Sequence, residues 1–98
     1  MNTEPSSFQK VLEALVETDK DFPQRYLREF SDLGNFELKT ILDVWPRVEL
    51  NRKLTLLDEL ATLAGTDTLV SFDDFARAML TDHDAQVRTR AIRLLDEA

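Results

Sequence analysis

Apolar residues recur at intervals of three and four along nearly the whole chain, the spacing that places them on one face of an α-helix. Glycine and proline are scarce, and they fall where this periodicity is interrupted. The interruptions divide the chain into six predicted helices, at about residues 7–18, 22–34, 36–45, 50–64, 72–80 and 85–98. The sequence therefore predicts an all-α protein.

The starts of these helices carry residues suited to N-caps. Ser6 and Ser71 each have a polar side chain three residues later, Gln9 and Asp74, as in a capping box. Asn35 and Asp84 are the other predicted N-caps.

The helix breakers give the remaining boundaries. Pro23 suits the first position of a helix, whereas Pro46 is expected to kink or break the third helix. Gly34 and Gly65 are predicted to end the helices before them.

The six helices group into three consecutive pairs, at residues 7–34, 35–65 and 71–98, within one domain over residues 1–98. A shift of 37 residues superposes six apolar positions of the second pair on six of the third: Leu38, Ile41, Leu42, Leu50, Leu54 and Leu57 on Phe75, Ala78, Met79, Val87, Ala91 and Leu94. A shift of 27 residues relates the second pair to the first more weakly. Two-helix repeats of about 40 residues are typical of α-solenoids, whose units bury their faces by stacking on one another.

The last pair has Asp82 in the turn, Val87 and Arg88 early in the second helix, and Ala91 and Leu94 beyond them. With these residues it resembles a HEAT repeat. In the middle pair, Trp45 replaces the turn aspartate, Leu50 and Asn51 replace the Val-Arg pair, and Leu54 replaces the small alanine. The first pair keeps only the helical hairpin, as a degenerate capping unit. The resemblance implies a right-handed α-solenoid of three antiparallel helix pairs.

Charge and residue types narrow the possible chemistry. The chain has 19 acidic and 12 basic side chains, a net charge of −7, one histidine and no cysteine. A disulfide, a thiolate zinc site and a cysteine nucleophile are therefore excluded. Asp82, His83 and Asp84 are the only cluster of metal-ligand type, and we interpret them as a repeat-turn aspartate, an exposed histidine and a helix cap. The sequence predicts no enzymatic activity, no cofactor and no metal.

Basic residues stand at the starts of the second helices, where the helix dipole disfavours cations. They are Arg25, Arg52, Lys53, Arg88 and Arg90. One interpretation pairs them with acids just upstream, which are Asp19 or Asp21, Glu49, and Asp82 or Asp84. The other is a basic stripe that receives carboxylates or phosphates of a partner.

Trp45 also has two interpretations, as a packed core residue or as a half-exposed interface anchor beside Pro46. The candidate partner-binding residues are therefore Arg52, Lys53, Arg88, Arg90 and Trp45.

The last predicted helix has a wide apolar arc, formed by Ala91, Ile92, Leu94 and Leu95. A terminal repeat normally has a polar outer face. Three explanations follow: the chain is the N-terminal part of a longer solenoid, which we favour; the helix mediates self-association through Ile92 and Leu95; or Ile92 packs within its own unit.

These observations predict a scaffold that binds protein partners. One alternative is suggested by the resemblance to the HEAT-like repeats of phycobilisome lyases, which act on bilin chromophores. Another is nucleic-acid binding, as in HEAT-like DNA glycosylases, although the net negative charge disfavours it. The first residues do not form a signal peptide and no apolar run is long enough to cross a membrane, so a cytoplasmic location without membrane contact is expected.

Overall fold

The computed structural model describes residues 7–97. Its α-helices are α1 (Ser7–Val16), α2 (Asn35–Val44), α3 (Leu50–Thr66), α4 (Asp73–Met79) and α5 (Ala85–Asp96). Two 3-10 helices, η1 (Gln24–Phe30) and η2 (Trp45–Arg47), lie between them. No strand occurs among these residues, so the predicted all-α class is confirmed.

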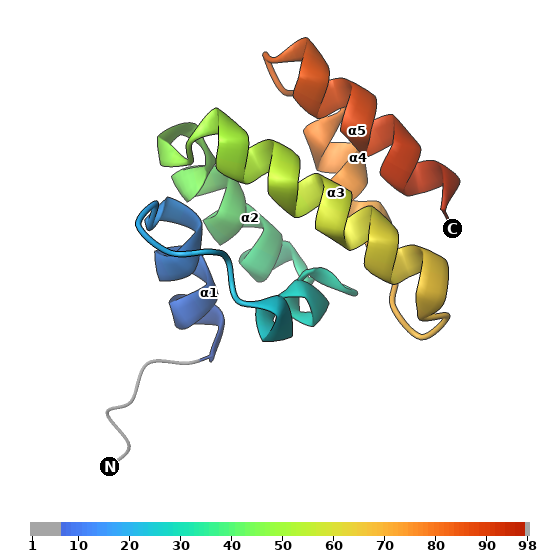
Figure 1. The fold of residues 1–98 in the computed structure, drawn as a ribbon, viewed down its shortest axis with the longest axis horizontal. Coiled ribbons are helices and arrows are strands. Elements are labelled where there is room, and N and C mark those ends of the chain that lie inside the picture. The colour runs from blue at the N-terminus through green and yellow to red at the C-terminus, as the bar shows by residue number, and fades with distance from the viewer. Residues whose placement is uncertain (1–6, 98) are drawn as a thin grey trace.

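The helices are arranged along one long direction, with extents of 43 × 28 × 25 Å. Figure 1 shows α1 and α2 at one end and α4 and α5 at the other, with the long helix α3 between them. Helix α3 contacts η1 on one side and α5 on the other, while α1 contacts both α2 and η1. Helix α3 therefore links the two ends of the molecule.

A single apolar core runs through all three predicted pairs. Neighbouring aromatic rings connect it, with centroid distances of 6.1 Å from Phe22 to Phe30, 5.0 Å from Phe30 to Phe75 and 5.6 Å from Phe75 to Trp45. Leu56, Leu57 and Leu60 of α3 are fully buried beside them. Because the core is continuous, the pairs stabilise one another.

The second predicted helix is a shorter 3-10 helix. Its first residue is Gln24, and Pro23 is the N-cap rather than the first helical residue. Leu27 and Phe30 are both buried, and a 3-10 helix places side chains three residues apart on the same side. The positive φ that follows is at Asp32 (53°) and not at Gly34.

Two predicted N-caps are corrected by the structure. Gly34 is the N-cap of α2, and Asn35 is its first residue. Helix α4 is preceded by Phe72 without a side-chain cap, so the predicted capping box of Ser71 and Asp74 is not formed. Ser6 lies outside the described residues, so its capping box is not described.

The cap at Asp84 is confirmed. Its carboxylate accepts hydrogen bonds from the backbone N–H groups of Gln86 (2.8 Å) and Val87 (3.3 Å). The predicted break near Pro46 is also confirmed, since α2 ends at Val44 and Pro46 lies in η2.

Gly65 does not end α3, which continues to Thr66. A Cβ atom on Gly65 would lie 3.1 Å from a carboxylate oxygen of Glu97. The absence of a side chain at Gly65 therefore leaves room for the Glu97 carboxylate beside the end of α3.

The buried positions of the second and third pairs do not match at the 37-residue shift. Of its six pairs of positions, only Leu57 and Leu94 are both buried, and Leu50 is 39% exposed opposite a fully buried Val87. A shift of 34 residues instead aligns four buried pairs: Ile41 with Phe75, Trp45 with Met79, Leu57 with Ala91, and Leu60 with Leu94.

Candidate interaction surface

Side-chain hydrogen bonds between distant parts of the described chain share one spacing. Apart from bonds between residues at most six positions apart, each joins residues separated by 32 to 40 positions. The separations exceed the 28 to 31 residues of a single predicted helix pair and are close to the repeat length of about 40 residues that is typical of α-solenoids. These bonds therefore join the pairs to one another along the molecule.

Arg52, at the start of α3, binds backbone carbonyl groups of the first pair. Its guanidinium donates to the carbonyl oxygens of Glu17 and Lys20, just beyond the end of α1. It also lies over the ring of Phe22, with Cζ 5.8 Å from the ring centroid. Carbonyl groups at the end of a helix lack intrahelical donors, so Arg52 satisfies such an acceptor at Glu17, while Lys20 lies in the loop beyond it.

Two other basic residues of this set lie on aromatic rings. The Lys53 ammonium is 5.3 Å from the centroid of the Trp45 ring, and the Arg25 guanidinium is 4.7 Å from that of Tyr26. Both are cation–π geometries.

Arg88 and Arg90 begin the second helix of the last pair. Arg88 donates to the carbonyl oxygens of Asp82 (2.7 Å) and His83 (3.0 Å), within its own turn. Arg90 forms an ion pair with Asp58 of α3 at 3.1 Å.

The predicted pairing of these cations with the acids just upstream is therefore wrong within the described residues. Of the basic residues in this set, only Arg90 forms an ion pair, and its partner lies in α3. Asp82 accepts from Arg88 through its carbonyl group, not its carboxylate. The cations bind carbonyl groups, rings and one distant acid instead.

Trp45 is a core residue, as the packing interpretation predicted, with 5% of its surface exposed. Its ring meets the ring of Phe75 nearly edge-on, at an interplanar angle of 83°. Its Nε1–H donates to Oδ2 of Asp82 at 2.8 Å. The alternative of a half-exposed anchor is thus not what the structure shows.

The outer face of α5 is less apolar than its sequence predicted. Ala91 and Leu94 are buried and Leu95 is half-buried, which leaves Ile92 exposed at 54%. The explanation that Ile92 packs within its own unit is therefore wrong. Self-association through Ile92 and Leu95 stays a prediction.

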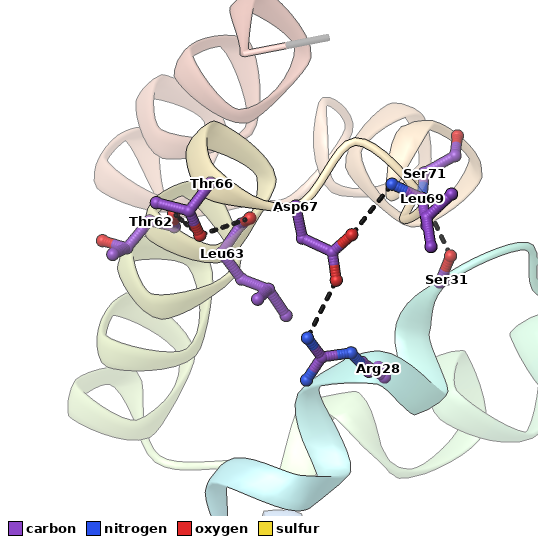
Figure 2. Close-up of polar contacts among 8 residues, drawn as sticks. All are labelled: Arg28, Ser31, Thr62, Leu63, Thr66, Asp67, Leu69 and Ser71. Carbon is purple, nitrogen blue, oxygen red and sulfur yellow. Dashed lines mark hydrogen bonds and ion pairs between the residues drawn. The ribbon is translucent and has the colours of Figure 1, made fainter.

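A hydrogen-bonded junction that the sequence analysis missed joins the end of η1 to the loop before α4. Arg28 forms an ion pair with Asp67 at 2.8 Å, and Oγ of Ser31 accepts from the Ser71 N–H at 2.9 Å (Figure 2). The Asp32 N–H donates to the Ser71 carbonyl at 3.0 Å. The available signal was Asp67 between two helices, since aspartate often binds the backbone two residues on.

Asp67 does form that local turn. Its Oδ1 accepts from the Leu69 N–H at 2.9 Å. This hydrogen bond is the largest cause that lowers the pKa of the Asp67 carboxyl below its ordinary value, and the hydrogen bond from the Arg28 guanidinium is the second. The ionised form of Asp67 is therefore favoured in the folded protein.

A groove runs along α3, opposite the segment 18–28. It consists of two adjoining hollows of about 560 Å³ each, and Gln24, Thr55 and Glu59 line both of them. The Gln24 side chain donates to Oε2 of Glu59 at 2.7 Å, which joins the two walls. We call this feature the α3 groove.

The sequence-predicted site residues do not form one site. Arg52 lines the α3 groove, Lys53 and Trp45 contact each other, and Arg88 and Arg90 lie on α5. No protein-family model, curated protein or solved structure matches this chain. Between residues 7 and 97, no helix combines the length and apolar character needed to cross a membrane.

Proposed function

We propose that this protein is a non-enzymatic scaffold for protein partners, built as a short solenoid of HEAT-like helix pairs. The observation that carries the proposal is the 32-to-40-residue spacing of the side-chain bonds between helix pairs. A stack of such units is held in one shape by contacts between neighbours, and it offers an extended surface to a partner.

The helix contacts support this arrangement. The second helices of the three pairs, η1, α3 and α5, form a row in which each contacts the next. The turns are also bonded between pairs, since Trp45 binds Asp82 and Arg52 binds Glu17 and Lys20. These bonds favour a rigid surface over a hinged one.

The contacts of the basic residues disfavour nucleic-acid binding. Arg52 and Arg88 donate hydrogen bonds to carbonyl oxygens, and Arg90 forms an ion pair with Asp58, so these side chains are poorly placed to bind phosphates. The protein is expected to flow through a heparin column at about 0.15 M salt.

The bilin alternative is tested separately. A bilin-binding role predicts a spectral change when bilin is added to the purified protein, and we expect no such change.

Site-specific photo-crosslinking in the source cells tests the scaffold. A photoreactive residue at exposed Thr55 or Thr62 of α3 is expected to capture one protein, whereas the same residue at exposed Lys39 of α2 is the matched control. The captured protein is then purified and titrated against the scaffold by calorimetry. The expected result is saturable binding with one fixed stoichiometry.

Failure of the purified pair to bind would overturn the scaffold proposal. Retention on heparin that is lost on charge removal from Arg52 and Arg88, without any protein partner, would replace it with nucleic-acid binding.

A further inference from the structure

We propose that η1 is a conformational switch. The contacts at its C-terminal end hold it as a 3-10 helix, and when they open it becomes an α-helix and changes the wall of the α3 groove. We call these contacts the η1 junction, and they are formed by Arg28, Ser31, Asp32, Asp67 and Ser71. This inference goes beyond the scaffold function and is tested on the protein alone.

Helix η1 is long for its type. It has seven residues, whereas 3-10 helices rarely exceed about four because their hydrogen-bond geometry is poor. Its apolar residues also fit the α-helical spacing i, i+1, i+4 and i+7, at Tyr26, Leu27, Phe30 and Leu33. The sequence of the segment therefore does not require the 3-10 form, and contacts outside the segment select it.

Asp32, directly after η1, has a strained backbone. Its φ of 53° is the only positive φ at a non-glycine residue in the part of the chain that the structure describes. Such a conformation is uncommon and persists only where surrounding contacts fix it. Here the Asp32 N–H donates to the Ser71 carbonyl at 3.0 Å, and the Ser71 N–H donates to Oγ of Ser31 at 2.9 Å. The loop before α4 thus fixes the strained residue.

The two forms of the segment compete for the N–H group of Asp32. In an α-helix, this N–H would donate to the carbonyl of Arg28, four residues before it. In the structure, the Arg28 carbonyl accepts from Ser31 at 3.0 Å, as in a 3-10 helix, and the Asp32 N–H points to Ser71. The Ser71 contact and an α-helix that includes residue 32 therefore exclude each other.

The ion pair between Arg28 and Asp67 supports the same junction (Figure 2). Asp67 also accepts from the Leu69 N–H at 2.9 Å, so it orders the loop that carries Ser71. The Arg28 side chain is 60% exposed, which makes the ion pair accessible from solvent. The junction can therefore be opened without disturbing the core.

A change in η1 reaches the α3 groove because η1 forms one of its walls. One hollow of the groove is lined by four residues of η1, which are Gln24, Arg25, Leu27 and Arg28. The Gln24 side chain also donates to Glu59 of α3 at 2.7 Å. An α-helix rises about 1.5 Å per residue and a 3-10 helix about 2.0 Å, so seven residues would shorten by about 3.5 Å. The bond from Gln24 to Glu59 and the position of Arg28 cannot both be kept.

The switch is local. Trp45 binds Asp82, and Arg52 binds carbonyl groups that precede η1, so neither contact involves η1. The packing of α3 against α5 also lies outside η1. The change is therefore confined to η1 and to the groove wall that it forms.

Two substitutions at position 32 should drive the segment in opposite directions. Asp32→Gly permits the positive φ and weakens a helix, whereas Asp32→Ala disfavours the positive φ and strengthens a helix. Both remove the same carboxylate and its hydrogen bond from Ser31, so they differ in backbone preference. Each is combined with Asp67→Asn, which weakens the junction. The ratio of α-helical to 3-10 molecules should be at least about thirtyfold higher with Asp32→Ala than with Asp32→Gly.

NMR spectroscopy distinguishes the two forms. NOEs from Hα of residue i to the amide proton of residue i+2 mark a 3-10 helix, and NOEs to residue i+4 mark an α-helix. With Asp32→Ala we expect the i+4 NOEs, together with a scalar coupling across the hydrogen bond from the N–H at position 32 to the Arg28 carbonyl instead of the Ser71 carbonyl. The side-chain amide signals of Gln24 should shift at the same time, because its bond to Glu59 is lost.

The switch is overturned if both variants keep the i+2 NOEs and the coupling to Ser71. It is also overturned if Asp32→Ala abolishes both kinds of NOE in η1 while α3 keeps its own, since η1 would then unfold rather than convert. Unchanged Gln24 signals in a converted segment would overturn the link to the groove. If the variant that includes Asp67→Asn does not fold, Asp32→Ala alone is measured and judged by the same outcomes.

Discussion

At the scale of single residues, Trp45 connects two turns through one polar atom. Its indole N–H donates to a carboxylate oxygen of Asp82, and its ring fills the core beside Phe75. Trp45→Phe keeps most of the apolar ring but leaves that carboxylate oxygen without its donor. We expect a loss of about 2 kcal/mol in the free energy of unfolding, measured by urea denaturation and far-UV circular dichroism.

A double-mutant cycle separates this hydrogen bond from the change in ring volume. Trp45→Phe, Asp82→Ala and the double variant should show a coupling of about 1 kcal/mol. Strict additivity of the two single losses would mean that the bond contributes nothing to stability.

Asp67 gives a pH-dependent contribution with a definite sign. The Leu69 N–H and the Arg28 guanidinium lower its pKa in the folded state, so the folded protein holds the carboxylate more strongly than the unfolded chain does. The resulting stability is present above the unfolded pKa of about 3.9, and it is lost as pH falls through the lower folded-state pKa. Asp67→Asn should therefore flatten the fall in stability below about pH 4, as measured by urea midpoints at several pH values.

Asp43→Asn removes the same charge from an exposed carboxylate that makes no described contact, and it is the control for that experiment. It should keep the pH dependence of the wild type. The explanation fails if the two variants lose stability in parallel.

At the scale of the elements, two residues that look alike as helix caps behave differently. Asp84 caps α5 through its carboxylate, whereas Ser71 binds Ser31 and Asp32 through its backbone. Asp84→Ala should cost about 1 kcal/mol of unfolding free energy, and Ser71→Ala less than about 0.5 kcal/mol. Thermal melts of the two variants compare them directly, and an equal loss would contradict the observed cap geometry.

The basic residues at the starts of α3 and α5 give a further test. Arg52 and Arg88 each donate to two carbonyl oxygens, so replacing either by alanine should lower the unfolding free energy by about 1–2 kcal/mol. Arg47→Ala is the matched control, because the exposed Arg47 side chain makes no described contact. Stability unchanged in the Arg52 and Arg88 variants, with partner binding weakened, would restore the basic stripe as a binding surface.

Most elements follow from hydrophobic spacing, and the exceptions have local causes. Leu27 and Phe30 stand three residues apart, a spacing that an α-helix and a 3-10 helix both satisfy, so periodicity did not separate them at η1. Gly65 was predicted to end a helix, but the structure places it beside the side chain of Glu97. Glu97 is 32 residues away in the sequence, so the rule that glycine ends a helix could not predict this contact.

At the scale of the whole molecule, the sequence located the notable charges but not their partners. The side-chain hydrogen bonds of Arg52 and Trp45 join residues that are 32 to 37 positions apart in the sequence, so they depend on how one helix pair packs against the next. The 37-residue alignment placed Trp45 opposite Asp82 as a replacement, and the structure shows that the two are hydrogen-bonding partners. The α3 groove was missed because it is formed by segments from two pairs.

The same stacking predicts how stability is distributed along the molecule. Helix α3 contacts both η1 and α5, and Leu56, Leu57 and Leu60 in its middle are fully buried. In contrast, η1 is a 3-10 helix of seven residues, in which hydrogen-bond geometry is poorer and several residues are exposed. We expect amides in the middle of α3 to exchange with solvent only on global unfolding, and amides of η1 to exchange at least about tenfold faster through local opening. Native-state hydrogen exchange measured by NMR compares them. Equal opening free energies for α3 and η1 would instead mean that the three pairs open as one cooperative unit, because contacts between pairs would then outweigh the weakness of the 3-10 helix.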